Sequence, residues 1–256
     1  MKRLLIVAAA AFALAGCASG GTEKGQMATD GGTKTELPAT AGRPEPQKVQ
    51  EAPDLPEATL AVLAESEDKT AAVLASPAPG NGTFDELTVR IGGQSKRFAW
   101  GQVTNPTYFP RVWTVNLDAE PDEEVVIVRT ADYGTGAFEN RIHVLKRDFR
   151  EMPVEDAVAK VRELAVVRAR TGPDVREFSL ELGGEIHTFA YDKGHAGYWF
   201  DGIVLGNVVD YKVEDGALVA EVSVQVSPGE FPGSIICRYT GQDGEFRIAD
   251  AKFVRS

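Results

Sequence analysis

The chain has 256 residues and a formal net charge of −11, with 38 Asp and Glu against 27 Lys and Arg. This excess of acid argues against nucleic acid or an anionic lipid surface as the partner, because both are bound through clustered Lys and Arg. The same excess favours solubility and an affinity for cations.

The N-terminus has the order of a secretion signal: Lys2 and Arg3, an uncharged run over residues 4–15, and then Leu14-Ala15-Gly16-Cys17. The last four residues resemble the lipobox of bacterial lipoproteins. The resemblance implies that residues 1–16 are a cleaved signal peptide and that Cys17 carries lipid, including palmitate. The alternatives are an ordinary cleaved signal or a membrane helix, but the run is shorter than the ~20 residues that span a bilayer.

Loss of residues 1–16 removes Lys2 and Arg3 and no acid, which takes the formal net charge from −11 to −13. No second apolar run reaches membrane length, so the lipid would be the only anchor. We expect an extracytoplasmic protein held to a membrane through Cys17. Residues 17–55 are rich in Gly, Thr, Pro, Glu and Lys, which predicts a flexible tether.

Residues 56–256 are expected to form a single β-rich domain. Cys237 is the only cysteine left after the lipid site, so no disulfide forms within this domain. Its alternating strand context favours a buried, inert thiol over a redox or nucleophilic one. Near the start, residues 56–66 predict a short helix, and residues 70–76 fit either a strand or a helix.

Two segments align without gaps at an offset of 91: residues 86–100 and residues 177–191. Each reads as strand, Gly-Gly turn, strand, because alternating residues flank a glycine pair that tolerates positive φ. The alternative is that any two β-hairpins look alike. The shared ending of Phe, Ala and an aromatic residue favours an internal duplication, spanning about 86–146 and 177–254.

Between the two copies, residues 153–170 predict a helix, with apolar residues at helical spacing, acids at its start and Arg towards its end. Further strands are predicted over 204–213, 217–226, 235–240 and 246–254. The expected fold class is mainly β (α+β), with antiparallel sheets from two related halves bridged by one helix.

Residues 111–145 predict three strands joined by two unlike loops. The first loop, residues 116–124, holds five carboxylates in seven residues. It resembles the short calcium loops written D-x-D-G-D-G-x-x-E, and the resemblance implies calcium ligands at Asn116, Asp118, Glu120 and Glu124. Ala119 and Pro121 stand where that pattern has glycine, so a solvated acidic turn is the alternative.

Aromatic residues recur in both copies, which suits stacking on sugar faces, although alternating aromatic residues on strands are also typical of a core. Catalytic spacing is missing: His143, His187 and His195 form no HExxH motif, and no GxSxG or CxxC is present. The pattern therefore favours a non-enzyme, with no catalytic residue nominated.

Residues 70–256 also resemble a group of uncharacterised extracytoplasmic proteins of spore-forming bacteria. The likeness is carried by the acidic loop, by the run over residues 124–128 and by the YGTG turn over residues 133–136. It implies no activity.

Two functions follow as expectations. The first is a lipid-anchored binding or structural module of the cell envelope, whose partner is an envelope polymer or protein. The second is an envelope hydrolase that uses a carboxylate pair.

Overall fold

The computed structural model describes residues 59–256, except 78–79 and 119. The predicted signal peptide, the lipid site Cys17 and the tether lie outside the described residues. The chain divides into two compact units, Met1–Glu51 and Ala52–Ser256, and the description below concerns the second. Within the described part, no helix has both the length and the apolar character needed to cross a membrane.

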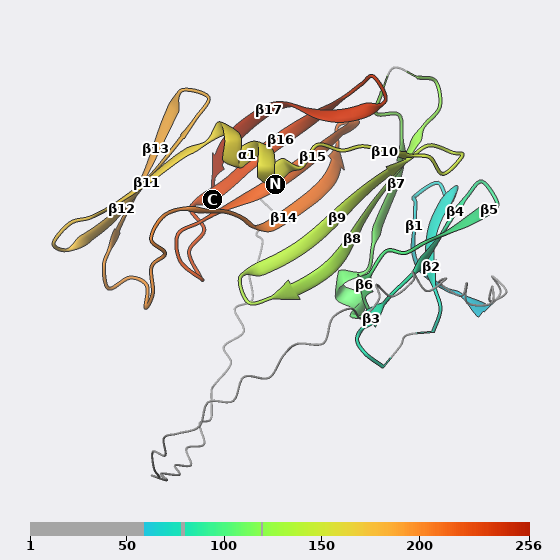
Figure 1. Cartoon of the computed structure of the whole chain (residues 1–256), viewed down its shortest axis with the longest axis horizontal. Helices are drawn as coiled ribbons and strands as arrows, with labels where there is room; N and C mark the ends of the chain where they lie inside the picture. Colours follow the sequence, from blue (N-terminus) through green and yellow to red (C-terminus); the bar gives the residue numbers. More distant parts are fainter. Residues whose placement is uncertain (1–58, 78–79, 119) are drawn as a thin grey trace, which may run out of the picture. The chain divides into compact units, whose positions relative to one another are not determined.

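The described chain is mainly β, as predicted, with several antiparallel sheets and one α-helix among the residues described (Figure 1). In chain order, its elements are β1 (Ala61–Glu65), β2 (Ala71–Ala75), β3 (Thr83–Phe84), β4 (Leu87–Ile91), β5 (Gln94–Phe98), β6 (Gln102–Val103), the 3-10 helix η2 (Pro106–Tyr108), β7 (Arg111–Val115), β8 (Glu124–Gly134), β9 (Ala137–Leu145), β10 (Glu151–Met152), α1 (Ala157–Leu164), β11 (Val166–Thr171), β12 (Val175–Leu182), β13 (Glu185–Asp192), β14 (Val204–Glu214), β15 (Ala217–Gln225), β16 (Gly233–Gln242) and β17 (Glu245–Arg255).

The largest sheet has eight strands in the order β17-β16-β15-β14-β9-β8-β7, with β10 paired to β9. The three predicted strands of residues 111–145 form one end, and the four predicted strands of residues 204–254 form the other. Neighbours within each group are antiparallel, whereas β9 and β14 are parallel. The sheet therefore joins an N-terminal and a C-terminal group of strands along one parallel seam.

Two hydrophobic cores flank this sheet, and β8 contributes to both. Val125 and Ile127 belong to one core, together with the four-stranded sheet β1-β2-β4-β5. Val126 and Val128 belong to the other core, which includes β12 to β17 and α1. Successive side chains of a strand point to opposite faces, so a continuous apolar run is the sequence that a strand covered on both faces requires.

The two predicted Gly-Gly hairpins are present and match in detail. Ile91 pairs with Gln94 around the first turn, and Leu182 pairs with Glu185 around the second. All four turn glycines have positive φ, between 57° and 87°. The hairpins nevertheless cover different cores: β4 packs in the core of the four-stranded sheet, and β12 in the other.

The predicted helix over residues 153–170 is too long. The helix α1 ends at Leu164, and Val166–Thr171 form the edge strand β11, paired with β12. β-branched residues at 166, 167 and 171 favour an extended chain, and pairing with β12 outweighs the helical spacing of the apolar residues. Asp156 caps the helix, since its side chain accepts a hydrogen bond from the backbone N–H of Ala159 at 2.9 Å.

The predicted short helix over residues 56–66 is also wrong where the structure describes it, because Ala61–Glu65 form β1, paired with β2. The segment for which strand and helix both stayed open is β2, which is fully buried. Cys237 is buried as well, and burial raises the pKa of its thiol to about 11, consistent with an inert residue.

Candidate functional site

The parallel seam between β9 and β14 is a short joint within the eight-stranded sheet. Only two residue pairs form it, Val208 with Phe138 and Val209 with Glu139. Residues of both strands line a cleft beside this joint.

The path of β14 at the seam depends on Gly206. This residue has φ of 82°, and a Cβ atom placed there would lie 2.7 Å from both Cγ atoms of Val158 in α1. Only glycine allows the helix to approach so closely. Arg162 of α1 also donates to the carbonyl of Leu205 at 2.8 Å, and β14 is irregular between Leu205 and Val209. The helix thus forms one wall of the cleft.

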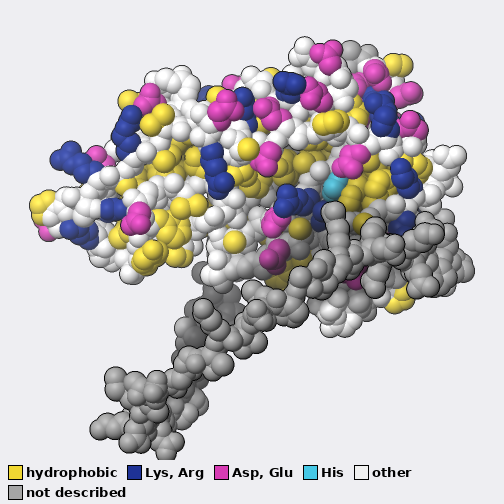
Figure 2. Space-filling model, viewed as in Figure 1, with side chains coloured by type: hydrophobic (Ala, Val, Ile, Leu, Met, Phe, Trp, Pro, Cys, Tyr) yellow, Lys and Arg dark blue, Asp and Glu magenta, His cyan; other side chains and the backbone are white. Residues whose placement is uncertain are grey.

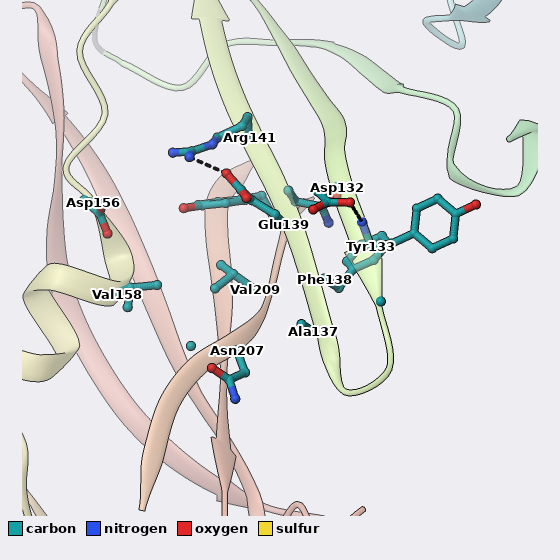
Figure 3. A pocket seen from close by; sticks show the side chains of 14 residues that line it. Asp132, Tyr133, Ala137, Phe138, Glu139, Arg141, Asp156, Val158, Asn207 and Val209 are labelled. Carbon is teal, nitrogen blue, oxygen red and sulfur yellow. Dashed lines mark hydrogen bonds and ion pairs between the residues drawn. The ribbon is translucent and has the colours of Figure 1, made fainter. Parts of the chain in front are cut away.

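Two adjoining cavities, of about 500 and 410 Å³, occupy the cleft. They share the lining residues Asn140, Arg141, Asp156 and Tyr211, so they adjoin, and together they make up the seam groove. A volume of this size lies in the range of small-molecule sites. Figure 3 shows Arg141 extending from β9 towards the side on which Asp156 and Val158 lie.

The groove is acidic. Its lining contains one basic side chain, Arg141, and five carboxylates, from Asp132, Glu139, Glu151, Glu155 and Asp156. Arg141 forms an ion pair with Glu139, drawn in Figure 3. Figure 2 shows acidic and basic side chains side by side over the region where β9 and β14 meet. The groove is therefore better suited to a cation than to an anion.

Tyr211 supplies the groove with a buried phenol. The residue is 7% exposed and lines both cavities. Burial raises its pKa to about 12, and the negative charge of Asp156 adds to the shift, so the hydroxyl stays protonated at neutral pH. The described residues provide no hydrogen-bond partner for this hydroxyl. It is free to bond a ligand.

A polar network links the strands at the seam, and one of its members, Asn140, also lines the groove. Arg111 of β7 forms a bidentate ion pair with Asp210 of β14. The side chain of Asn140 in β9 also donates a hydrogen bond to Asp210, at 2.8 Å. The hydroxyl of Thr130 donates to Asn140 at 3.0 Å. These bonds link β7, β8, β9 and β14, so the cleft has a rigid floor.

The acidic loop is organised around a lysine. Three of the four predicted calcium ligands, Asp118, Glu120 and Glu124, lie 2.9, 2.9 and 2.5 Å from the Nζ atom of Lys146. The fourth, Asn116, instead donates from its side chain to the carbonyl of Glu120. The ammonium group stands where calcium was expected. Among the described residues, no group of three or more His, Cys, Asp and Glu side chains is arranged to hold a metal ion.

Lys146 and Asp118 shift each other's pKa. Burial alone would lower the pKa of Lys146, but hydrogen bonds to Glu124, Asp118 and Glu120 outweigh it and raise that pKa. Burial would raise the pKa of Asp118, but its bonds with Lys146 and the N–H of Glu120 lower it. Glu124 is fully buried and also accepts from the N–H of Leu117 at 2.7 Å. The loop is thus a compact ion-pair network.

The histidines do not converge on a site. His143 is held between Glu151, whose carboxylate lies 2.6 Å from Nδ1, and Arg129, which donates to Nε2 at 3.0 Å. Its ring stacks on Trp100 at a centroid distance of 3.6 Å. His187 and His195 pair with Glu185 and Glu230 elsewhere.

The aromatic residues divide between core and surface. Trp100, Phe178 and Phe189 are buried, whereas Tyr198 is 63% exposed. The rings of Tyr133 and Tyr108 pack in a tilted arrangement with their centroids 4.4 Å apart, and Figure 3 shows the Tyr133 ring pointing away from Asp156 and Val158. Of the described aromatic residues that line the larger cavity, Tyr133, Phe138 and Tyr211, only Tyr133 is exposed.

The described residues form a mainly β fold with an acidic cleft at the joint between two groups of strands. No family model matches the chain, and neither the curated proteins nor the solved structures include a match to it. Its function must therefore be argued from the groove.

Sequence reasoning did not find the groove. Glu139, Arg141, Asp156 and Tyr211 come from three separate segments, and no local motif connects them. The available signal was Asp156 as the residue before the helix, which was read only as part of its acidic start. The pairing of β9 with β14, which brings the set together, has no signature in the sequence.

Proposed function

We propose that the chain is a lipid-anchored extracytoplasmic binding module of the cell envelope, and that it takes up its ligand in the seam groove. The observation that carries this proposal is the hydroxyl of Tyr211, which has no partner among the described residues and belongs to a residue that is 7% exposed and lines both cavities. This hydroxyl is not one of the described buried atoms that lack a partner, so solvent reaches it, and a ligand that bonds it would replace that water.

The anchor is supported by the lipobox residues Leu14-Ala15-Gly16-Cys17. One acyl chain gives only marginal membrane binding, whereas a diacylglycerol plus an N-acyl chain would hold the protein stably. Labelling with radioactive palmitate should mark the full chain and not a Cys17→Ala variant. Equal labelling of the two, or none of either, would contradict the anchor.

The binding role is tested by blocking the groove. Ala137 is exposed and lines the larger cavity, so Ala137→Trp should fill space there without disturbing a core. The full chain, purified in detergent and immobilised, is exposed to envelope extract beside this variant. We expect at least one component, polymer or protein, to be retained by the parent chain and lost by Ala137→Trp. Identical retention by both would contradict a binding role for the groove.

A second function stays open because the larger cavity brings together the carboxylates of Asp132, Glu139 and Asp156. An envelope hydrolase would need two such groups, one as acid and one as base or nucleophile. The discriminating measurement is the fate of a retained component. A binding module releases it unchanged, whereas a hydrolase shortens it, and Glu139→Gln or Asp132→Asn would then abolish the shortening.

A further inference from the structure

The charges around the seam groove limit which ligands it accepts. Arg141 is the only basic residue in the lining, and it is already paired with Glu139. Asp132 and Asp156 form no ion pair with any described residue: each accepts a backbone N–H, from Tyr133 at 2.8 Å and from Ala159 at 2.9 Å. An anionic ligand would meet this excess of carboxylates without a free positive charge to bind.

The other two carboxylates of the groove, from Glu151 and Glu155, add to its negative charge. Glu151 lies at the far end of the groove and binds His143. Glu155 accepts from the N–H of Ile248 at 2.8 Å and lies 3.8 Å from the Nζ atom of Lys160. The carboxylates therefore have fixed positions before a ligand arrives, which lowers the entropy cost of binding.

The groove also offers an apolar surface. Val158 of α1 and Val209 of β14 line the larger cavity beside the polar groups, and both are labelled in Figure 3. The hydroxyl of Tyr211, kept neutral, can accept one hydrogen bond and donate another. A carboxylate pair, a phenol and an aliphatic wall together fit a protonated amine on a hydrocarbon stem.

We infer that the seam groove binds a cationic, amine-bearing ligand, whose ammonium group lies among Glu139, Asp156 and the hydroxyl of Tyr211. The inference rests on the proposed function and narrows it to a ligand class. Lysine-like side chains of a peptide and free alkyl amines share this chemistry.

A pair of probes isolates the charge. 1,6-Diaminohexane and 1,6-hexanediol have the same carbon chain, and only the diamine is positively charged at neutral pH. Calorimetric titration of the full chain should show binding of the diamine and none of the diol. The affinity for the diamine should fall as the salt concentration is raised, because salt screens the charges in the exposed parts of the groove.

Three variants locate the site. Asp156→Asn keeps a good helix cap, and Glu139→Gln keeps the side-chain shape. Each should lower the affinity for the diamine by about tenfold, the value of a charged hydrogen bond. Tyr211→Phe removes only the hydroxyl, so it should lower the affinity for the diamine by roughly fivefold and leave the melting temperature unchanged. Asp201→Asn, an exposed acid outside both cavities, is the matched control and should bind as the parent does.

The outcomes separate this inference from the proposed function. Diamine affinity that is the same in all four variants would place the binding elsewhere on the acidic surface and overturn the inference. Equal binding of diol and diamine would also overturn the inference. If Ala137→Trp then still lost the envelope component, the proposed function would stand, with the groove as a site for a neutral ligand. No binding of the diamine by the parent chain overturns the inference as well.

Discussion

The Nζ atom of Lys146, at the end of β9, lies 2.5 Å from Oε1 of Glu124, at the start of β8, and both side chains are buried. Removing one partner of a buried pair leaves an uncompensated charge. We therefore expect Lys146→Met to lower the free energy of unfolding by about 3–5 kcal/mol in urea titrations.

The neighbouring pair of Arg147 and Glu123 provides the control, because both of its side chains are about half exposed. Arg147→Met should cost less than about 1 kcal/mol, as exposed ion pairs do. Equal effects of the two substitutions would mean that Glu124 finds another partner or water when Lys146 is lost.

Calcium should leave the parent protein unchanged. The ammonium of Lys146 already neutralises the carboxylates that the sequence suggested as calcium ligands, and it lies within 2.9 Å of three of them. The measurement is the melting temperature of the full chain in chelator, in calcium and in magnesium. A rise of several degrees in calcium alone would show that the loop binds the metal after all.

Acid should destabilise the fold through His143. Burial is the main cause that lowers its pKa to about 4, and the charges of Arg129 and Arg141 act in the same direction, against the opposing effect of Glu151. The unfolded chain takes up this proton near pH 6.5, so it binds more protons than the folded chain between pH 6.5 and 4. The stability that His143 contributes is therefore fully present above pH 6.5 and is lost as the pH falls towards 4.

The loss attributable to His143 should be up to roughly 3 kcal/mol, from a shift of two to three pKa units at 1.36 kcal/mol each. It is read as the difference between the parent and His143→Gln in urea titrations across this pH range. Two parallel stability curves would assign the acid sensitivity to other groups.

The glycine turns of the two hairpins should respond alike to substitution. Gly93 and Gly184 have φ of 87° and 85°, and a Cβ atom at either would meet nothing within 4 Å, so only backbone strain opposes alanine. We expect Gly93→Ala and Gly184→Ala each to cost about 1–2 kcal/mol. Gly194→Ala, which has equal space and no positive φ, should be neutral in the same unfolding assay.

The sequence predicted those parts of the fold that have local signatures. Both Gly-Gly hairpins and all four C-terminal strands appear where turn residues and alternation placed them. The helix was extended too far because its end was placed from Arg168 and Arg170, which lie beyond the last apolar residue at helical spacing, Ala165. The duplication of whole halves stays a prediction; the structure adds the matching registers of the two hairpins.

The site escaped prediction for a physical reason. The partners of the acidic loop and of the groove are distant in sequence: Lys146 is 22 residues from Glu124, and Asp210 is 70 from Asn140. The sequence showed that the loop carboxylates repel one another, and it offered solvent exposure or calcium as the relief, calcium being the one that a local motif suggested. A single lysine directly after a buried strand was the overlooked signal, since lysine is rarely buried unless it is paired.

The central claim is that the ligand meets the protein in the seam groove, and photocrosslinking in cells tests it most directly. A photoreactive residue at Ala137 lies in the groove, and one at Ile186, 65% exposed on β13, lies outside it. The account predicts a crosslinked envelope component with the probe at position 137 and none at position 186. The same products from both positions, or products from position 186 alone, would contradict it.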